Sequence, residues 1–350
     1  MKEYLIGKTL NDLQIICKDL SMPSFAAKQL ADWLYKKKVT SIDQMTNLSL
    51  THRKILEEKY AVGRQEPLKQ QKSTDGTIKY LFSSEANRFI ESVFIPDKER
   101  ATLCVSSQVG CKMNCLFCMT GKQGFNAQLT SAEIINQILS IPESEKLTNL
   151  VFMGMGEPLD NIDEVLKTLD ILTASYGFAW SPKRITVSTI GVIPPLKRFL
   201  EESQCHLAVS LHSPFHEERM GWMPIEKKYP AEEIIALLRN YDFAHQRRLS
   251  FEYICFGGLN DDLLHAKALV RLLSGLPARV NLIKYHQIPG INLPSSLEEN
   301  MIRFRDYLSE HGVTCTIRSS RGEDILAACG MLSTKENCKP QDKNVPLSSK

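Results

Sequence analysis

From about residue 100 onward, the chain alternates short apolar runs with amphipathic segments whose apolar residues recur every three or four positions. The apolar runs predict strands and the amphipathic segments predict helices. Strands are expected over 101–107, 149–153, 184–189, 206–211, 249–255, 279–285 and 313–319. Helices are expected between them, over 130–139, 162–175, 194–202, 230–240, 261–273 and 296–311. This alternation is typical of parallel strands joined by crossover helices.

Six or seven such strand–helix units indicate a full or partial barrel rather than a sandwich. In barrels of this kind, functional residues gather on the loops at the carboxyl ends of the strands. The segments that fall at those ends are a cysteine-rich loop, GMGEP, STIG and SLHSP, at residues 110–124, 154–158, 188–191 and 210–214. We therefore look for chemistry in these four segments.

The first third of the chain has a different pattern. Residues 1–62 predict short helices, 63–76 predict a polar linker or turn, and strands follow over 78–84 and 88–96. The polar tail predicts disorder. The expected organisation is a helical domain over 1–72, connecting strands over 73–98, a barrel core over 99–333 and a disordered tail over 334–350.

Composition and charge exclude some classes of protein. Hydrophobic residues make up 43% of the chain, but no apolar run approaches the length needed to span a membrane. No secretory signal is visible, so we expect a cytoplasmic protein, in which ten cysteines favour metal or thiol chemistry over disulfides. Residues 1–72 hold 13 Lys and Arg against 8 Asp and Glu, a balance of +5 within a net charge of +3. This excess fits either a surface that contacts nucleic acid or a solvated helix face.

The cysteine-rich loop, GCKMNCLFCMTGKQG, places Cys111, Cys115 and Cys118 at the spacing C-x3-C-x2-C, with no fourth cysteine beside them. Three thiolates can hold three irons of a [4Fe–4S] cluster and leave the fourth iron open to a substrate or cofactor. A zinc site completed by a distant residue is the alternative that spacing leaves open. Cys104 is separated from this loop by about 15 Å of extended chain, so we do not expect it to be a ligand.

The spacing C-x3-C-x-aromatic-C, with Phe117 as the aromatic residue, resembles the signature of the radical S-adenosylmethionine (SAM) superfamily. Further segments resemble the RlmN/Cfr family of 23S rRNA adenine methyltransferases, most closely its dual-specificity members. These segments are residues 102–121, 152–161, 188–191, 210–214, 223–225 and 318–330. The resemblance runs from about residue 5 to residue 332. It implies an α/β fold, a partial (β/α)6 radical SAM barrel with a small, mainly helical accessory domain.

The resemblance also implies an activity: methylation of carbon 2 of adenine 2503 in 23S rRNA and of adenine 37 in tRNAs, with two SAM molecules used per turnover. Cys111, Cys115 and Cys118 would hold a [4Fe–4S] cluster, and an electron donor such as flavodoxin or ferredoxin would reduce it. Cys329 would be methylated first and would then link the protein to RNA through its methylene carbon. Cys104 would resolve that link through a transient disulfide, and Glu91 would accept the ring proton.

The same resemblance assigns a SAM-binding site. Gly156 and Glu157 would contact the methionine end of SAM, and Ser188, Ser210, Leu211, His212 and His286 would line the site. His286 stands where many relatives have asparagine. Read without the resemblance, GMGEP could be a simple turn, Cys104 and Cys329 could be small buried hydrophobic residues, and Glu91 could be a solvated strand residue.

Two other functions stay open at this point. The sister family methylates carbon 8 of the same rRNA adenine, but this chain has Pro158 and the run SRGEDI at 320–325, where carbon-8 enzymes typically have alanine and lack the Arg-Gly-acidic run. The other alternative, a zinc-stabilised RNA-binding protein without catalysis, would be distinguished by iron and sulfide analysis.

Overall fold

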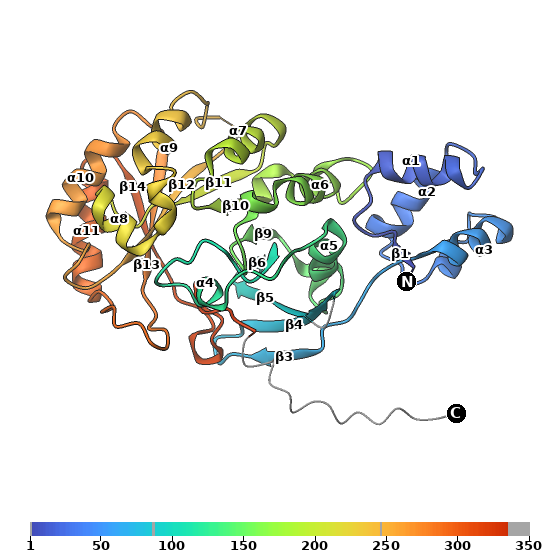
Figure 1. Ribbon diagram of the computed structural model, residues 1–350, viewed down its shortest axis with the longest axis horizontal. Coiled ribbons are helices and arrows are strands. Elements are labelled where there is room, and N and C mark those ends of the chain that lie inside the picture. The colour runs from blue at the N-terminus through green and yellow to red at the C-terminus, as the bar shows by residue number, and fades with distance from the viewer. Residues whose placement is uncertain (1, 86–87, 246, 335–350) are drawn as a thin grey trace.

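The computed structural model describes residues 2–85, 88–245 and 247–334. One large sheet dominates it, with the strand order β14-β13-β12-β11-β10-β9-β6-β5-β4-β3 (Figure 1). Its strands are β3 (Lys69–Lys72), β4 (Ile78–Ser84), β5 (Arg88–Asp97), β6 (Arg100–Cys104), β9 (Asn149–Phe152), β10 (Ile185–Thr189), β11 (His206–Ser210), β12 (Leu249–Cys255), β13 (Ala278–Lys284) and β14 (Thr314–Arg318).

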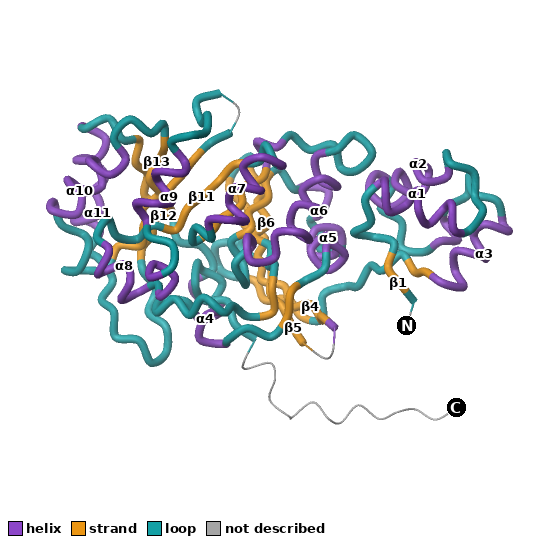
Figure 2. Tube along the Cα trace, turned by 45° about the horizontal axis from the view of Figure 1, so that its top comes forward, coloured by secondary structure: helices purple, strands orange, loops and turns teal. Residues whose placement is uncertain are grey.

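Strand β6 and strands β9 to β14 run parallel to one another. Helices cross between them on the outer side of the curved sheet (Figures 1 and 2). They are α5 (Ser131–Leu139), α6 (Ile162–Thr173), α7 (Ile193–Glu202), α9 (Ala231–Leu238), α10 (Leu263–Leu273) and α11 (Glu298–Glu310). Because β14 ends the sheet and pairs only with β13 there, the barrel is open. The predicted α/β fold with a partial barrel is therefore confirmed.

The two faces of the parallel sheet differ in character. Side chains alternate between the faces of a strand. In β12, Phe251 and Tyr253 are fully buried in the apolar core under the helices. Glu252 and Ile254, on the other face, line a cavity inside the curve of the sheet. The outer face therefore provides the hydrophobic core, and the inner face is available for function.

The antiparallel strands β3 to β5 extend the same sheet beyond β6. The segment 63–76 was expected to be a linker or turn, but residues 69–72 form β3, an edge strand exposed at all four positions. Its sequence, KQQK, carries no apolar alternation from which a strand could be predicted. The strand is instead held in place by its pairing with β4, in which Lys69 lies opposite Leu81.

The N-terminal unit lies at one end of the molecule, beside α5 and α6 (Figures 1 and 2). It contains β1 (Glu3–Tyr4), α1 (Leu10–Asp19), α2 (Ala26–Ala31), a π-helical turn (Asp32–Lys36), a 3-10 turn (Ile42–Gln44), α3 (Leu50–Lys59) and β2 (Tyr60–Ala61). Gly7 passes so close to α5 that an added Cβ would lie 2.3 Å from the backbone nitrogen of Ala132. An ion pair of 2.8 Å between Asp12 and Lys167 ties the unit to α6.

Short elements complete the carboxyl-end face of the sheet. They are β7 (Gln108–Val109), β8 (Ala127–Gln128), α4 (Met119–Gln123), α8 (His216–Trp222) and β14's following 3-10 turn (Glu323–Ile325). Within the described part of the chain, no helix is both long and apolar enough to cross a membrane. The predicted tail, apart from Thr334, lies outside the described residues.

Candidate active site

A cavity opens at the carboxyl ends of the parallel strands and collects most of the residues selected from the sequence. They are Cys104, Cys111, Cys115, Cys118, Gly156, Glu157, Ser188, Ser210, His212 and Cys329. They come from loops far apart in the chain, and parallel strands bring them to one edge because their carboxyl ends all lie there.

The cysteine loop follows β6 and β7 and is anchored by its aromatic residue. The Phe117 ring, 8% exposed, meets the edge of the His212 ring at a centroid distance of 4.8 Å and lies 5.9 Å from the Phe256 ring. The backbone N–H of Leu116 donates to the carbonyl of Trp222 at 2.8 Å. The aromatic position of the signature therefore fastens the loop to the strand ends that line the cavity.

Burial raises the pKa of Cys111 to about 12 and also raises the pKa values of Cys115 and Cys118, each thiol being raised further by the charge of a neighbouring cysteine. Three thiols that carry protons in the protein alone would be deprotonated by a bound metal group. No three Cys, His, Asp or Glu side chains among the described residues converge on a single metal ion. In an iron–sulfur cluster each thiolate binds its own iron, so the donor set fits such a cluster.

Glu157 is a buried carboxylate held by its own loop and by the loop that follows β10. Its Oε1 accepts hydrogen bonds from the Thr189 hydroxyl at 2.5 Å and from the Leu159 N–H at 3.1 Å, and its Oε2 accepts from the Ile190 N–H at 3.0 Å. Burial raises its pKa to about 7 against the effect of these donors. A cationic amino group placed in this cavity would find a fixed, partly desolvated anion.

Gly156, next to Glu157, has a structural requirement for glycine. Its φ is +100°, and an added Cβ would lie 2.5 Å from the side chain of Gln108. Gln108 is fully buried, and its Oε1 accepts the N–H of Glu157 at 2.8 Å. The glycine thus allows the GMGEP loop to approach the segment that leads into the cysteine loop.

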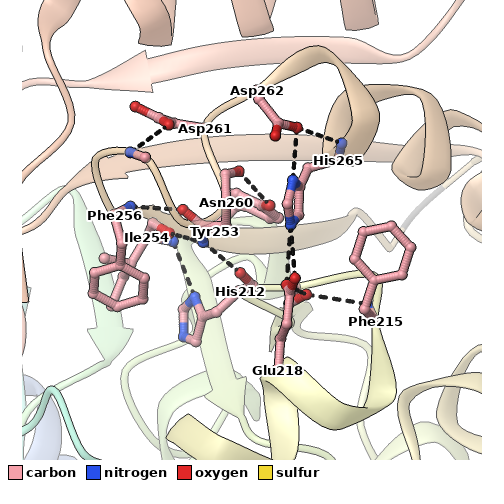
Figure 3. A network of polar contacts seen from close by, with 12 residues as sticks. His212, Phe215, Glu218, Tyr253, Ile254, Phe256, Asn260, Asp261, Asp262 and His265 are labelled. Atoms are coloured by element: carbon pink, nitrogen blue, oxygen red, sulfur yellow. Dashed lines mark hydrogen bonds and ion pairs between the residues drawn. The ribbon is translucent and has the colours of Figure 1, made fainter.

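His212 is fixed in one tautomer by the network in Figure 3. Its Nδ1 accepts the N–H of Ile254 at 3.0 Å, and burial lowers its pKa to about 3. The neutral ring therefore carries its proton on Nε2. Asn260 donates from Nδ2 to the carbonyls of His212 at 2.7 Å and Ile254 at 2.8 Å, and accepts the N–H of Phe256 at 2.6 Å. It holds His212 in the left-handed conformation, at φ +59°.

A buried arginine joins the loops that carry Ser188 and Ser210. Arg219, in α8, is 0% exposed and forms an ion pair with Glu226. It donates to the carbonyls of Ile190 at 3.0 Å and Ser210 at 3.1 Å. Because Glu226 also accepts the N–H of Ala231 at 3.1 Å, the pair connects two strand-end loops with the start of α9.

Cys104 and Cys329 lie along the same cavity wall, and both are free thiols. Cys104 is buried at the end of β6, and burial together with the charge of Cys329 raises its pKa to about 12. Arg318, the last residue of β14, lines the same cavity and pairs with Glu252 at 3.3 Å. The charge of Cys329 is the main reason that the pKa of Arg318 is raised. The Cys104 and Cys329 thiols and the Arg318 guanidinium are therefore close enough for the charge of one to affect the others.

The segment that carries Cys329 is fastened to α4, which begins directly after Cys118. The N–H of Met119 donates to the carbonyl of Gly330 at 2.7 Å, and the Thr120 hydroxyl donates to the carbonyl of Leu332 at 2.7 Å. Gln123 hydrogen-bonds Thr334. The cysteine loop and the Cys329 segment therefore share one short helix.

Three predicted site residues do not line this cavity. Leu211 is buried between Ser210 and His212 and presents its backbone to Arg219 and Glu252. His286 lines a third cavity, with Nε2 3.0 Å from the Ser320 hydroxyl and Nδ1 3.2 Å from a Glu323 oxygen that is not aligned for a hydrogen bond. Glu91 is in a second cavity.

Glu91 is held by an ion pair of 3.2 Å with Lys79 and accepts the N–H of Ser333 at 3.1 Å. Burial raises its pKa, although Lys79 opposes that effect. Val93, two residues further along β5 and therefore on the same face, lines the first cavity. Glu91 and Val93 are therefore neighbours on one face of β5, with Glu91 in the second cavity and Val93 in the cavity that holds the thiols.

Comparison with known proteins places these features in a family. The model of the radical SAM superfamily matches residues 105–269, and the model of the ribosomal RNA large subunit methyltransferase N-terminal domain matches residues 4–62. A crystal structure of a radical SAM methyltransferase from Sphaerobacter thermophilus superposes with a TM-score of 0.89 at 36% identity, covering 95% of this chain and 100% of that chain.

Curated relatives share nearly the whole length. The probable dual-specificity RNA methyltransferase RlmN of Parabacteroides distasonis is 62% identical, over 96% of this chain and 98% of its own. That of Bacteroides fragilis is 63% identical, over 95% and 97%. The dual-specificity RNA methyltransferase RlmN of Syntrophus aciditrophicus is 40% identical, over 93% and 95%.

An open parallel barrel with a three-cysteine loop at its strand ends makes this chain a radical SAM enzyme. The superfamily uses SAM and an iron–sulfur cluster. Within it, the chain belongs to the RlmN family of RNA methyltransferases.

Proposed function

We propose that the protein methylates carbon 2 of adenine 2503 in 23S rRNA and of adenine 37 in tRNAs, through an S-methylcysteine and a transient protein–RNA link, with two SAM molecules per turnover. The observation that carries this proposal is that Cys104 and Cys329 share one cavity with the three cysteines of the signature. A methyltransferase that moved the methyl group directly from SAM would need neither extra thiol.

The residues of the cavity would divide the binding of cofactors between them. Cys111, Cys115 and Cys118 would hold a [4Fe–4S] cluster, which when bound supplies the electron for SAM cleavage. Glu157 would hold the SAM ammonium through charge-assisted hydrogen bonds. Gly156, Ser188, Ser210 and His212 would line the rest of the site, with the Nε2–H of His212 as a donor, and Leu211 would support it through its backbone bonds to Arg219 and Glu252. His286 is also proposed for this site, although its side chain lines another cavity, where it contacts Ser320.

The two thiols outside the loop would act in sequence. The Sγ of Cys329 would take a methyl group from one SAM and would then give up a hydrogen atom of that group to the 5′-deoxyadenosyl radical supplied by cleavage of a second SAM. Its methylene carbon would bond to carbon 2 of the base, which would lose its ring proton to Glu91 and one electron, for which the bound cluster is the available acceptor. The Cys104 thiolate then attacks the Sγ of Cys329. That attack forms the S–S bond and breaks the S–C bond, and the methylene carbon left on the base takes up a proton to become the methyl group.

Two features near Cys104 support these roles. Because the pKa of its thiol is raised to about 12, Cys104 is protonated until attack and needs a base or the Arg318 charge to form a thiolate. Glu91 is the proposed acceptor of the ring proton. Burial raises the pKa of its carboxyl group and so makes it a stronger base, while the Lys79 ammonium 3.2 Å away opposes that effect.

The partners follow from this activity. We propose 23S rRNA and tRNA as substrates, a cytoplasmic location, an electron donor such as flavodoxin or ferredoxin, and RNA contacts from residues 1–72. The test of the function is mass spectrometry of adenosine from rRNA and tRNA of cells with the gene present and deleted. We expect 2-methyladenosine only where the gene is present; its equal abundance in both strains would end the proposal.

A further inference from the structure

A third cavity, of about 580 Å³, runs along the inside of the curved sheet from the strand beginnings to Cys329. Its wall at the strand beginnings consists mainly of cationic and polar residues. Arg100 is the first residue of β6, Lys183 lies two residues before β10, His206 is the first residue of β11, and Arg248 precedes β12. Because these strands are parallel and lie in the order β12-β11-β10-β9-β6, the four residues all lie at the strand-beginning end of the sheet.

The inner face between the strand beginnings and Cys329 combines apolar side chains, such as Ile95, Val151 and Ile283, with a polar network. Glu252 accepts hydrogen bonds from Asn281 at 2.8 Å and Ser250 at 3.2 Å, and Asn281 in turn accepts the Thr316 hydroxyl at 2.8 Å. Closed β/α barrels pack this space with branched apolar residues. Here the open barrel keeps a cavity with a partly polar lining, and only about 13 Å of strand separates Arg100 from Cys104.

The cations at this edge lack counter-charges. Of the charged residues that line the cavity, Arg318 pairs with Glu252 and Arg321 with Asp97. Arg100, Lys183 and Arg248 have no carboxylate partner among the described residues. Burial together with Arg248 and Lys183 lowers the pKa of His206 to about 4, and burial together with Arg279 and Arg100 lowers that of Arg248. These groups repel one another, and a bound anion would relieve that repulsion.

The lysine run of the N-terminal unit is different, because each of its lysines already has a carboxylate partner, with Lys36 and Lys37 sharing Asp32. Lys37 pairs with Asp32 at 3.4 Å, and Lys38 pairs with Glu145 at 2.7 Å. Glu145 lies just before β9, so Lys38 meets the barrel at the same strand-beginning side. The unpaired cations at the strand beginnings are therefore a stronger candidate for an anion-binding site than this lysine run.

We propose that Arg100, Lys183 and Arg248, with His206 between them, bind backbone phosphates of the RNA substrate and admit the target nucleotide to Cys329 from the strand-beginning side. This proposal rests on the proposed RNA methylation. Enzymes that act on a base flip it into a pocket while the flanking phosphates stay at the rim. An acidic electron-donor protein fits less well, because it must approach the cysteine loop at the opposite ends of the strands.

The test uses the full chain with its cluster, and a labelled RNA stem–loop with an adenine in the loop. Affinity is measured by fluorescence anisotropy over a range of salt concentrations for the wild type and for Lys183→Ser/Arg248→Ser. Each lost phosphate contact lowers the slope of log K against log salt by about 0.7 on a single strand. We expect a slope smaller by about 1.4, which corresponds to roughly twentyfold weaker binding at 0.1 M salt.

The matched control is Lys267→Ser/Arg271→Ser, which removes two exposed cations from α10 on the outside of the barrel. It should leave the slope unchanged, and both double variants should unfold at the wild-type temperature. An unchanged slope in Lys183→Ser/Arg248→Ser would overturn the proposal. So would retained RNA binding with lost affinity for a polyglutamate peptide, which would assign the edge to an acidic protein.

These outcomes are separable from failure of the proposed function. If Lys183→Ser/Arg248→Ser lowers the salt slope as expected but the wild type yields no 2-methyladenosine, the function is wrong and the phosphate site is supported. If the wild type yields 2-methyladenosine and Lys183→Ser/Arg248→Ser binds equally well, the phosphate site is wrong and the function stands.

Discussion

The Thr189 hydroxyl donates a hydrogen bond of 2.5 Å to Oε1 of Glu157, and it lowers the pKa of a carboxyl group that burial raises to about 7. A SAM ammonium would bind the ionised form. The affinity for SAM should therefore fall as the pH falls through 7, by about tenfold between pH 8 and pH 6, because one proton is involved.

Isothermal titration calorimetry with SAM at several pH values checks this dependence. Thr189→Val removes the donor and should move the midpoint to higher pH, whereas Glu157→Gln should bind weakly at every pH. His212, whose pKa is lowered to about 3, does not titrate in this range. A flat profile for the wild type would show that Glu157 does not hold the ammonium.

Replacing Cys111, Cys115 or Cys118 by Ala should abolish SAM cleavage. Anaerobically prepared wild type should contain about four irons per chain, as a single [4Fe–4S] cluster requires. Cys205→Ala is the control, because Cys205 is buried away from the cavity and should affect stability but not iron content. Iron and sulfide analysis measures the difference, and stoichiometric zinc in a fully active protein would refute the cluster.

Cys104→Ala and Cys329→Ala should fail at different stages. Cys329→Ala should keep its iron but form no methylated RNA and no protein–RNA adduct. Cys104→Ala should accumulate adduct, because no thiol remains to break the S–C bond. Denaturing gels with labelled RNA distinguish the two, and normal turnover by Cys104→Ala would remove that residue from the mechanism.

The product should be 2-methyladenosine without detectable 8-methyladenosine. Arg321 and Glu323 precede Cys329, and a displacement of about 1 Å at a reacting centre can change a rate about a hundredfold. Digestion of RNA modified by the pure enzyme, followed by chromatography and mass spectrometry, resolves the isomers. A product that is mainly 8-methyladenosine would show instead that this enzyme has the carbon-8 activity of the sister family.

Asn260→Ala should destabilise the protein by about 1–3 kcal/mol, because it leaves buried carbonyls of His212 and Ile254 and the N–H of Phe256 without partners. It should also weaken SAM binding, since His212 would lose its fixed orientation. Asn260→Asp keeps the acceptor for Phe256 but loses the donors. Thermal unfolding and calorimetry together test this, and a stable variant with normal SAM affinity would contradict it.

The parallel barrel and the cysteine loop could be predicted because their signals are local. Strand–helix alternation predicts the crossovers, and three thiols within eight residues indicate a ligand set. The resemblance added Cys104, Glu157 and Ser188, and the structure places them in the same cavity. All three lie at the carboxyl ends of parallel strands, where the strand–helix alternation predicts that functional residues gather.

Other parts of the site depend on tertiary contacts that no local pattern shows. A charged residue such as Arg219 is usually exposed, and its complete burial is made possible by Glu226 and three strand-end carbonyls, those of Ile190, Ser210 and Leu211. Asn260 had no motif of its own. His286 and Glu91 line neighbouring cavities because loop and strand geometry, rather than residue type, sets where a side chain points.

The shared attachment of α4 to the Cys329 segment has a consequence for biosynthesis. A ribosome delivers the cysteine loop long before it delivers Gly330 and Leu332, whose carbonyls complete the hydrogen bonds of α4. A nascent chain therefore lacks Cys329 and the final support of the cysteine loop at the same time. The cysteine loop and the proposed methyl acceptor can reach their final arrangement only together, once residues 329–332 have been made.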